Sequence, residues 1–268
     1  MTLEQVTTVL NTYGVLFRPC GQMIRPFLRA RIRFVMQWFA LDFCYGDNNF
    51  IVDKGVFMAG NGNTAFRFRV TLRLDGRECW REILVPASLT FFDLHAVLQE
   101  CFTWHGEHLF CFCATFPDGK QVQVEELWGE EPSYHEANYE QYMPVEPLPE
   151  VRIASETELG DVFPKARTAR YYYDYGDDWI HDIKLLRTYR SVHVADPQLW
   201  DGAGDAPSED VGGVYGFERF LDTLGNPEDE EHDGMVEWAE DQMWDRFTLN
   251  RHRERLFRWH KHRDMMLQ

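Results

Sequence analysis

The sequence lacks the features typical of secreted, membrane-spanning and disulfide-stabilised proteins. Its longest apolar run, from Phe34 to Tyr45, is interrupted by Gln37 and Asp42 and is too short to cross a bilayer. Residues 1–10 show no basic start followed by an apolar block, so no signal peptide is expected. The six cysteines include no C-x-x-C pair, and a disulfide framework is not expected in so long a chain. These absences predict a cytoplasmic protein without membrane contact.

The sequence also lacks the short motifs of well-known catalytic sites. It contains no G-x-S-x-G turn, no P-loop, no G-x-G-x-x-G and no H-E-x-x-H. Cys20 lies near a predicted loop, but the sequence offers no base that can be paired with it. The absence of these motifs therefore disfavours an enzyme, and the sequence predicts no cofactor beyond the divalent metal ion considered below.

Charge is plentiful but unevenly placed along the chain. The formal net charge is −17, residues 1–70 carry +4 and residues 246–268 carry +5, which leaves −26 between them. An acidic body repels a phosphate backbone, so wrapping of nucleic acid by the central region is disfavoured. The two basic ends have two interpretations: they contact nucleic acid, or they neutralise the acidic body.

Residues 1–60 differ in pattern from the rest of the chain. The stretch from Thr2 to Tyr13 predicts a short helix. Further on, Arg25, Arg29 and Arg33 recur at intervals of four and share one face if that segment is helical. We expect a partly helical N-terminal extension, whose arginine row is a candidate contact for phosphate groups or an acidic partner.

The clearest element begins at Phe66. Apolar and polar residues alternate strictly from Phe66 to Leu74, which is typical of a half-buried strand. Asp75-Gly76 follows, and this dipeptide is the strongest short signal for a hairpin turn. A two-residue turn places Arg69 opposite Glu82, and opposite charges across the ladder favour that register.

A helix and two more strands are predicted next. Thr90 and Asp93 form a capping-box signature ahead of an apolar stripe, on whose edge His95 is expected at the helix surface. Strands follow at residues 108–116 and 121–124. Two strands, a helix and two strands predict an α+β fold, in which a helix crosses a β-grasp-like mixed sheet.

The remainder of the chain predicts more strands followed by helices. An acidic stretch at 125–150 is expected to be a loop. The pattern then predicts strands at 169–175 and 179–187, a loop at 196–210, and helices at 214–224, 229–241 and 248–266.

Five sequence blocks carry a resemblance to a known family. They are WREILVP at 80–86, the pair Leu94-His95, HLF at 108–110, YDYGDDWIHDI at 173–183 and PSEDVGGVYGF at 207–217. In this order and spacing they resemble the plasmid pRiA4b ORF-3-like family, whose members also occur beside insertion elements. The resemblance implies an α+β domain over residues 64–268, with residues 1–60 outside it, and it implies no particular reaction.

Two positions depart from the family pattern. The family usually has a histidine where this chain has Phe110, and commonly a cysteine where it has Val211. Any metal role of these family positions is therefore not carried over to this chain.

Two acidic segments inside the matching blocks are candidate site segments. Clustered carboxylates repel one another unless a cation, an arginine or backbone N–H groups offset the charge. If the two segments meet, their carboxylates with His181 or His108 would suit Mg²⁺, Mn²⁺ or Ca²⁺. The catalytic candidates are Asp174, Asp177, Asp178, His181, Glu209 and Asp210, and the metal candidates are Asp177, Asp178, His181 and Asp210.

The same residues have a purely structural interpretation. Alternation places His181 on one strand face with Trp179 and Ile183, where a histidine is commonly a core residue. Asp177 and Asp178 are typical of a tight turn, and Glu209 with Asp210 are typical of a helix cap. In that case the two segments form a structural brace between loops.

Three functions remain open on the sequence. The first is a non-enzymatic protein-interaction or regulatory module acting with plasmids or mobile elements. The second is a metal-dependent hydrolase or nuclease that uses the acidic segments to hold a water-activating metal. The third is nucleic-acid binding through the Arg25, Arg29 and Arg33 row or through RHRERLFRWHKHR at 251–263, where aromatic residues lie among the cations.

Overall fold

A computed structural model describes residues 58–126 and 149–267, with side chains from residue 62 onward. The chain divides into two compact units, residues 1–62 with 191–193, and residues 63–190 with 194–268. The predicted N-terminal helix and the Arg25, Arg29 and Arg33 row lie outside the described residues. All that follows concerns the second unit.

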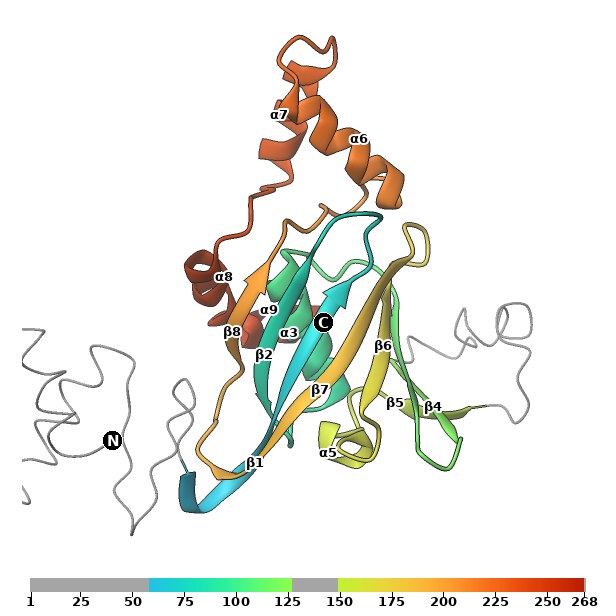
Figure 1. Ribbon diagram of the computed structural model, residues 1–268, viewed down its shortest axis with the longest axis vertical. Helices are drawn as coiled ribbons and strands as arrows, with labels where there is room; N and C mark the ends of the chain where they lie inside the picture. The colour runs from blue at the N-terminus through green and yellow to red at the C-terminus, as the bar shows by residue number, and fades with distance from the viewer. Residues whose placement is uncertain (1–57, 127–148, 268) are drawn as a thin grey trace, which may run out of the picture. The chain divides into compact units, whose positions relative to one another are not determined.

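One mixed sheet of eight strands forms the centre of this unit (Figure 1). The strands follow the order β5-β4-β3-β6-β7-β1-β2-β8, with β4 and β5 parallel to each other. The predicted α+β class is therefore confirmed. The elements are β1 (Met58–Leu72), β2 (Trp80–Pro86), α3 (Phe91–Phe102), β3 (Phe110–Thr115), β4 (Gln121–Glu125), β5 (Glu150–Ile153), α5 (Leu159–Val162), β6 (Thr168–Tyr173), β7 (Trp179–Val192), β8 (Gln198–Ala203), α6 (Gly213–Gly225), α7 (His232–Asp241), α8 (Leu249–Leu256) and α9 (Trp259–Met266).

The β1–β2 ladder has the predicted register. Arg69 lies opposite Glu82, and the backbone N–H of Leu72 donates to Cys79 at 2.9 Å, which continues the same register. The alternating apolar side chains of β1 are buried in the core, as the pattern indicates. Arg73 leaves this hairpin and binds Asp182 of β7 through two hydrogen bonds of 2.8 Å.

Helix α3 lies across one face of the sheet and begins at the predicted capping box. The Thr90 hydroxyl accepts from Asp93 N, and the Asp93 carboxylate accepts from Thr90 N. The expectation that His95 lies at the helix surface is wrong, because its side chain is only 2% exposed. His95 faces the sheet, where its ring stacks on that of Phe110 of β3 at 3.8 Å between centroids and its Nδ1 lies 2.7 Å from the Tyr171 hydroxyl of β6. The C-terminal helices α8 and α9 also pack against α3.

Two other predictions need correction. The segment predicted as a loop at 196–210 contains β8, an edge strand that pairs with β2. The helix predicted at 248–266 is divided into α8 and α9, because the Arg258 N–H donates to the i−3 carbonyl of Arg255. No helix in the described ranges is long and apolar enough to cross a membrane.

The loops at one end of the sheet bring distant segments together. The β6–β7 turn and the start of α6 lie side by side, and α6 continues into a helical hairpin with α7 (Figure 1). The segment between α3 and β3 joins them at the same end. We call residues 103–109, 174–178 and 204–212 the loop end.

Candidate functional site

Glu209 is the main anchor of the loop end. Its side chain is 4% exposed, and one carboxylate oxygen accepts the backbone N–H of His105 at 2.7 Å. The same oxygen lies 2.9 Å from His105 Nδ1, and the other accepts the hydroxyl of Tyr173. One buried carboxylate therefore connects the segment after α3, the end of β6 and the segment before α6.

The protonation of this anchor follows from its partners. Burial alone would raise the pKa of Glu209, but hydrogen bonds from His105 and Tyr173 outweigh it and lower the pKa. The bond to Glu209 in turn raises the pKa of His105. The two groups therefore favour a carboxylate and an imidazolium in contact.

The β6–β7 turn is organised by its own aspartates. One oxygen of Asp174 accepts the N–H groups of Gly176 at 2.9 Å and Asp177 at 3.3 Å. Asp177 reaches across to the segment before α6, where it accepts the N–H of Gly212 at 3.1 Å. The two acidic segments thus meet and are held together by hydrogen bonds, as a structural brace requires.

A histidine and two aspartates converge beside this brace. His108 Nε2 lies 3.7 Å from an Asp174 oxygen and 3.4 Å from an Asp210 oxygen. One ligand atom from each of the three residues lies within 4.8 Å of the other two. Asp174 is buried, whereas the side chain of Asp210 is 71% exposed. This cluster combines imidazole and carboxylate groups at the protein surface.

The candidate residues from the sequence occupy different places. Asp174, Asp177, Glu209 and Asp210 lie together at the loop end, and Asp178 ends the β6–β7 turn with a φ of 58°. His181 is fully buried in the core. Its ring packs 4.7 Å from that of Phe102 and 5.2 Å from that of Trp104, measured between centroids. Burial lowers the pKa of His181 to about 3, so its imidazole is neutral near pH 7.

His108 rather than His181 is the histidine that stands with Asp174 and Asp210. The sequence offered one signal for it, because His108 lies in the HLF block that carries the family resemblance. His105 and Tyr173, which hold Glu209, were not among the candidates. Tyr173 opens the YDYGDDWIHDI block, whereas His105 lies outside the five blocks and has no local pattern that separates it from an ordinary loop residue.

Comparison with known proteins agrees with the resemblance carried by the five sequence blocks. A family model described as "Plasmid pRiA4b ORF-3-like protein" matches residues 64–253. The chain belongs to this family. It is 30% identical over 184 residues to "Uncharacterized protein y4hQ" of Sinorhizobium fredii, covering 69% of this chain and 85% of the relative.

A solved structure shares the fold of this plasmid pRiA4b ORF-3-like protein. It is the crystal structure of a protein of unknown function, MM3350, from Methanosarcina mazei Go1. The TM-score is 0.56 at 25% sequence identity, and the match covers 70% of this chain and 96% of that one. The resemblance inferred from the sequence blocks is confirmed, and with it the α+β architecture.

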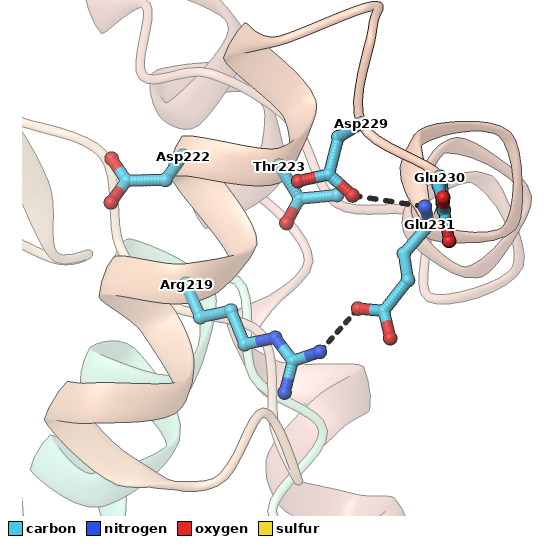
Figure 2. Close-up of a pocket in the computed structure, with 6 residues that line it drawn as sticks. All are labelled: Arg219, Asp222, Thr223, Asp229, Glu230 and Glu231. Carbon is cyan, nitrogen blue, oxygen red and sulfur yellow. Dashed lines mark hydrogen bonds and ion pairs between the residues drawn. The ribbon is translucent and has the colours of Figure 1, made fainter.

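The family member also has an acidic pocket between α6 and the segment that leads into α7 (Figure 2). The pocket has a volume of about 650 Å³. Its one arginine, Arg219, is already paired with Glu231, and Asp229 accepts the Glu231 N–H at 2.9 Å. The lining residues are Arg219, Asp222, Thr223, Asp229, Glu230 and Glu231. These residues bear a net negative charge and include no histidine.

Most of the basic side chains near the C-terminus bind other groups of the same protein. Seven Lys and Arg residues lie at 246–268, and five of them bind protein groups. Arg246 pairs with Asp205, Arg251 with Asp245, Arg255 with Glu100 and Arg263 with Asp93, and Arg253 donates to the carbonyl oxygens of Leu199 and Trp200. Of the two proposed roles for this end of the chain, these contacts favour neutralisation of the acidic body.

Proposed function

We propose that this domain is a non-enzymatic protein-binding module, with its contact surface on α8 and α9. The observation that carries the proposal is Phe257, a large apolar side chain that is 83% exposed between the two helices. Met265 and Leu267 are also exposed on the same segment, at 65% and 53%. We call Phe257, Arg258, Lys261, Met265 and Leu267 the α8–α9 face.

The opposite side of α8 and α9 packs on the rest of the domain, which leaves the α8–α9 face exposed to a partner. His252, Leu256, Trp259 and His262 are buried, because α8 packs on α3 and β8 while α9 packs on α3. Phe257, Lys261 and Met265 follow at intervals of four, which places them along one side of a helical path. Exposed apolar side chains gathered in this way are typical of binding surfaces.

The charges on this face indicate the chemistry of the partner. Arg258 and Lys261 form no ion pair with any residue in the described ranges, whereas four of the other five cations at 246–268 form ion pairs and Arg253 donates to backbone carbonyls. Two available cations beside an exposed phenylalanine fit a short segment with carboxylates around an apolar residue. A long nucleic acid fits less well, because the chain carries a net charge of −17.

The setting of this interaction is part of the proposal. The family description refers to a plasmid reading frame, which supports action together with plasmids or mobile elements. We propose that the partner is a protein that works with the same element.

Selection from a displayed random-peptide library tests the proposal. We expect the full chain to enrich peptides that combine Asp or Glu with Phe or Leu. The selected peptides should bind at least about tenfold more weakly to a Phe257→Ser/Arg258→Glu/Lys261→Glu variant. A matched control, Tyr215→Ser/Lys165→Glu/Lys184→Glu, changes one exposed aromatic residue and two exposed lysines elsewhere and should bind normally.

Two outcomes would contradict this proposal. One is equal binding of the selected peptides by both variants. The other is tight, salt-dependent binding of a single-stranded oligonucleotide that the α8–α9 face variant alone loses, since this would favour the nucleic-acid interpretation.

A further inference from the structure

We propose that His108, Asp174 and Asp210 bind a divalent transition-metal ion at the loop end. This inference is independent of the protein-binding proposal, because none of the three residues belongs to the α8–α9 face. It rests on the distances between the ligand atoms, on the missing hydrogen-bond partner of His108 Nε2 and on the contacts that fix the neighbouring residues.

The distances are longer than those of a direct hydrogen bond and approach those between ligands of one ion. His108 Nε2 lies 3.4 and 3.7 Å from the two carboxylates, beyond the usual N–H···O range of about 2.7–3.2 Å. An ion held about 2.1 Å from each ligand separates neighbouring ligand atoms by roughly 3.0–3.4 Å. Small side-chain rotations would close the remaining gap, and Asp210 has room for one because it is exposed.

The histidine nitrogen lacks another explanation. His108 Nε2 is shielded from solvent, and no described residue makes a hydrogen bond with it. A buried polar atom without a partner is costly, and native proteins usually satisfy such atoms with a protein group, a water or an ion. The nitrogen lies close to two carboxylates that would repel each other unless a positive charge stood between them.

The residues next to the ligands are fixed in place by Glu209. Tyr173 directly precedes Asp174, Glu209 directly precedes Asp210, and the Tyr173 hydroxyl donates to the Glu209 carboxylate. The backbone N–H of His105, three residues before His108, donates to the same carboxylate. All three ligand segments therefore meet at one buried anchor, which is the kind of support that metal ligands require.

The ligand set selects the class of ion. Imidazole suits zinc and similar transition metals, whereas magnesium and calcium prefer oxygen ligands alone. One imidazole and two carboxylates therefore favour Zn²⁺, with Mn²⁺ bound more weakly, over Mg²⁺ and Ca²⁺. With three protein ligands and an exposed Asp210, at least one coordination position would face solvent.

Thermal unfolding and metal titration of the full chain after dialysis against EDTA test the inference. We expect Zn²⁺ at about 100 times its Kd to raise the unfolding midpoint by roughly 5–10 °C, and Mg²⁺ to have little effect. Asp210→Asn should weaken Zn²⁺ binding at least about tenfold. This variant should fold, because the side chain is exposed and Asn tolerates the φ of 58° at this position.

A second set of measurements separates a built site from chance binding by surface histidines. His108→Ala should abolish the Zn²⁺ response, whereas His260→Ala should keep it, because His260 forms an exposed pair with Asp196 at 3.1 Å elsewhere. Cobalt substitution should give visible absorption bands that disappear in Asp210→Asn. No midpoint shift with Zn²⁺ or Mn²⁺, or an equal shift in His108→Ala and Asp210→Asn, would overturn the inference.

Discussion

The Glu209 anchor makes a quantitative prediction about stability. Glu209→Gln keeps the shape of the side chain but removes its charge and places an NH₂ group where the wild type has an acceptor. Three donors converge on this carboxylate: the His105 N–H, His105 Nδ1 and the Tyr173 hydroxyl. A hydrogen bond to a charged group contributes about 1.5–3 kcal/mol, and the glutamine can still accept part of the set. We expect the free energy of unfolding to fall by about 2–4 kcal/mol, which lowers the unfolding midpoint by roughly 5–15 °C.

The loss should depend on pH in a defined way. The pKa of Glu209 is lowered in the folded state, so its contribution is present above about pH 4.3 and disappears as the pH falls through the folded pKa. The pKa of His105 is raised, so its contribution is complete below about pH 6.5 and disappears as the pH rises through the folded pKa. The stability difference between wild type and Glu209→Gln should therefore be largest between about pH 4.3 and 6.5.

Urea denaturation at pH 5.5 and at pH 9 measures this difference. Glu218→Gln is the matched control, because Glu218 pairs with Arg77 at 3.0 Å on the exposed surface. It should cost less than about 1 kcal/mol. A Glu209→Gln loss as small as that of the control at pH 5.5, or one that grows toward pH 9, would refute the reasoning.

Substitutions at three further positions test the packing and helix capping of the fold by thermal or urea unfolding. The fully buried Arg81 donates to the carbonyl oxygens of Trp80, Cys101, Ala203 and Gly204, so Arg81→Met should destabilise the fold by about 3–5 kcal/mol, and a loss below 1 kcal/mol would contradict this. Thr90→Ala removes the N-cap of α3 and should cost about 1 kcal/mol, while Thr90→Ser should cost little. Gly106 has a φ of 78°, and an added Cβ would lie 2.2 Å from the Met266 sulfur, so Gly106→Ala should cost about 1–3 kcal/mol. A neutral Gly106→Ala would contradict both the strain expected at a φ of 78° and the contact with Met266.

The parts of the fold with strong local signals could be predicted from the sequence. The β1–β2 register followed from alternation and from the Asp75-Gly76 turn, and the start of α3 followed from Thr90 and Asp93. Both features depend on residues close together in the chain. Local interactions therefore suffice to predict them.

The parts that failed depend on distant segments. His95 was expected at the surface because its position on α3 alone suggests an edge, but its ring is buried against Phe110 of β3 and Tyr171 of β6. Strand β8 was missed because its sequence, QLWDGA, has weak strand propensity and gains its ladder from β2.

The candidate site shows the same division. The sequence pointed to two acidic segments as candidates, and the structure brings Asp174, Asp177, Glu209 and Asp210 together. It left both His108 and His181 open as ligands, because both belong to the matching blocks, although alternation along the strand already gave His181 a core interpretation. The three-dimensional arrangement places the His181 ring in the core and His108 at the loop end.

Helix α9 has a consequence for comparing this protein with its relatives. It lies after residue 253, where the family match ends, yet His262 Nε2 lies 2.8 Å from the His105 carbonyl oxygen, and Met266 packs against Gly106. The segment that carries His105 and His108 is thus supported by a part of the chain that family membership does not specify. A relative with a different C-terminal tail would have to support this segment by other contacts. Ligand geometry should therefore be transferred between members only when their tails are compared as well.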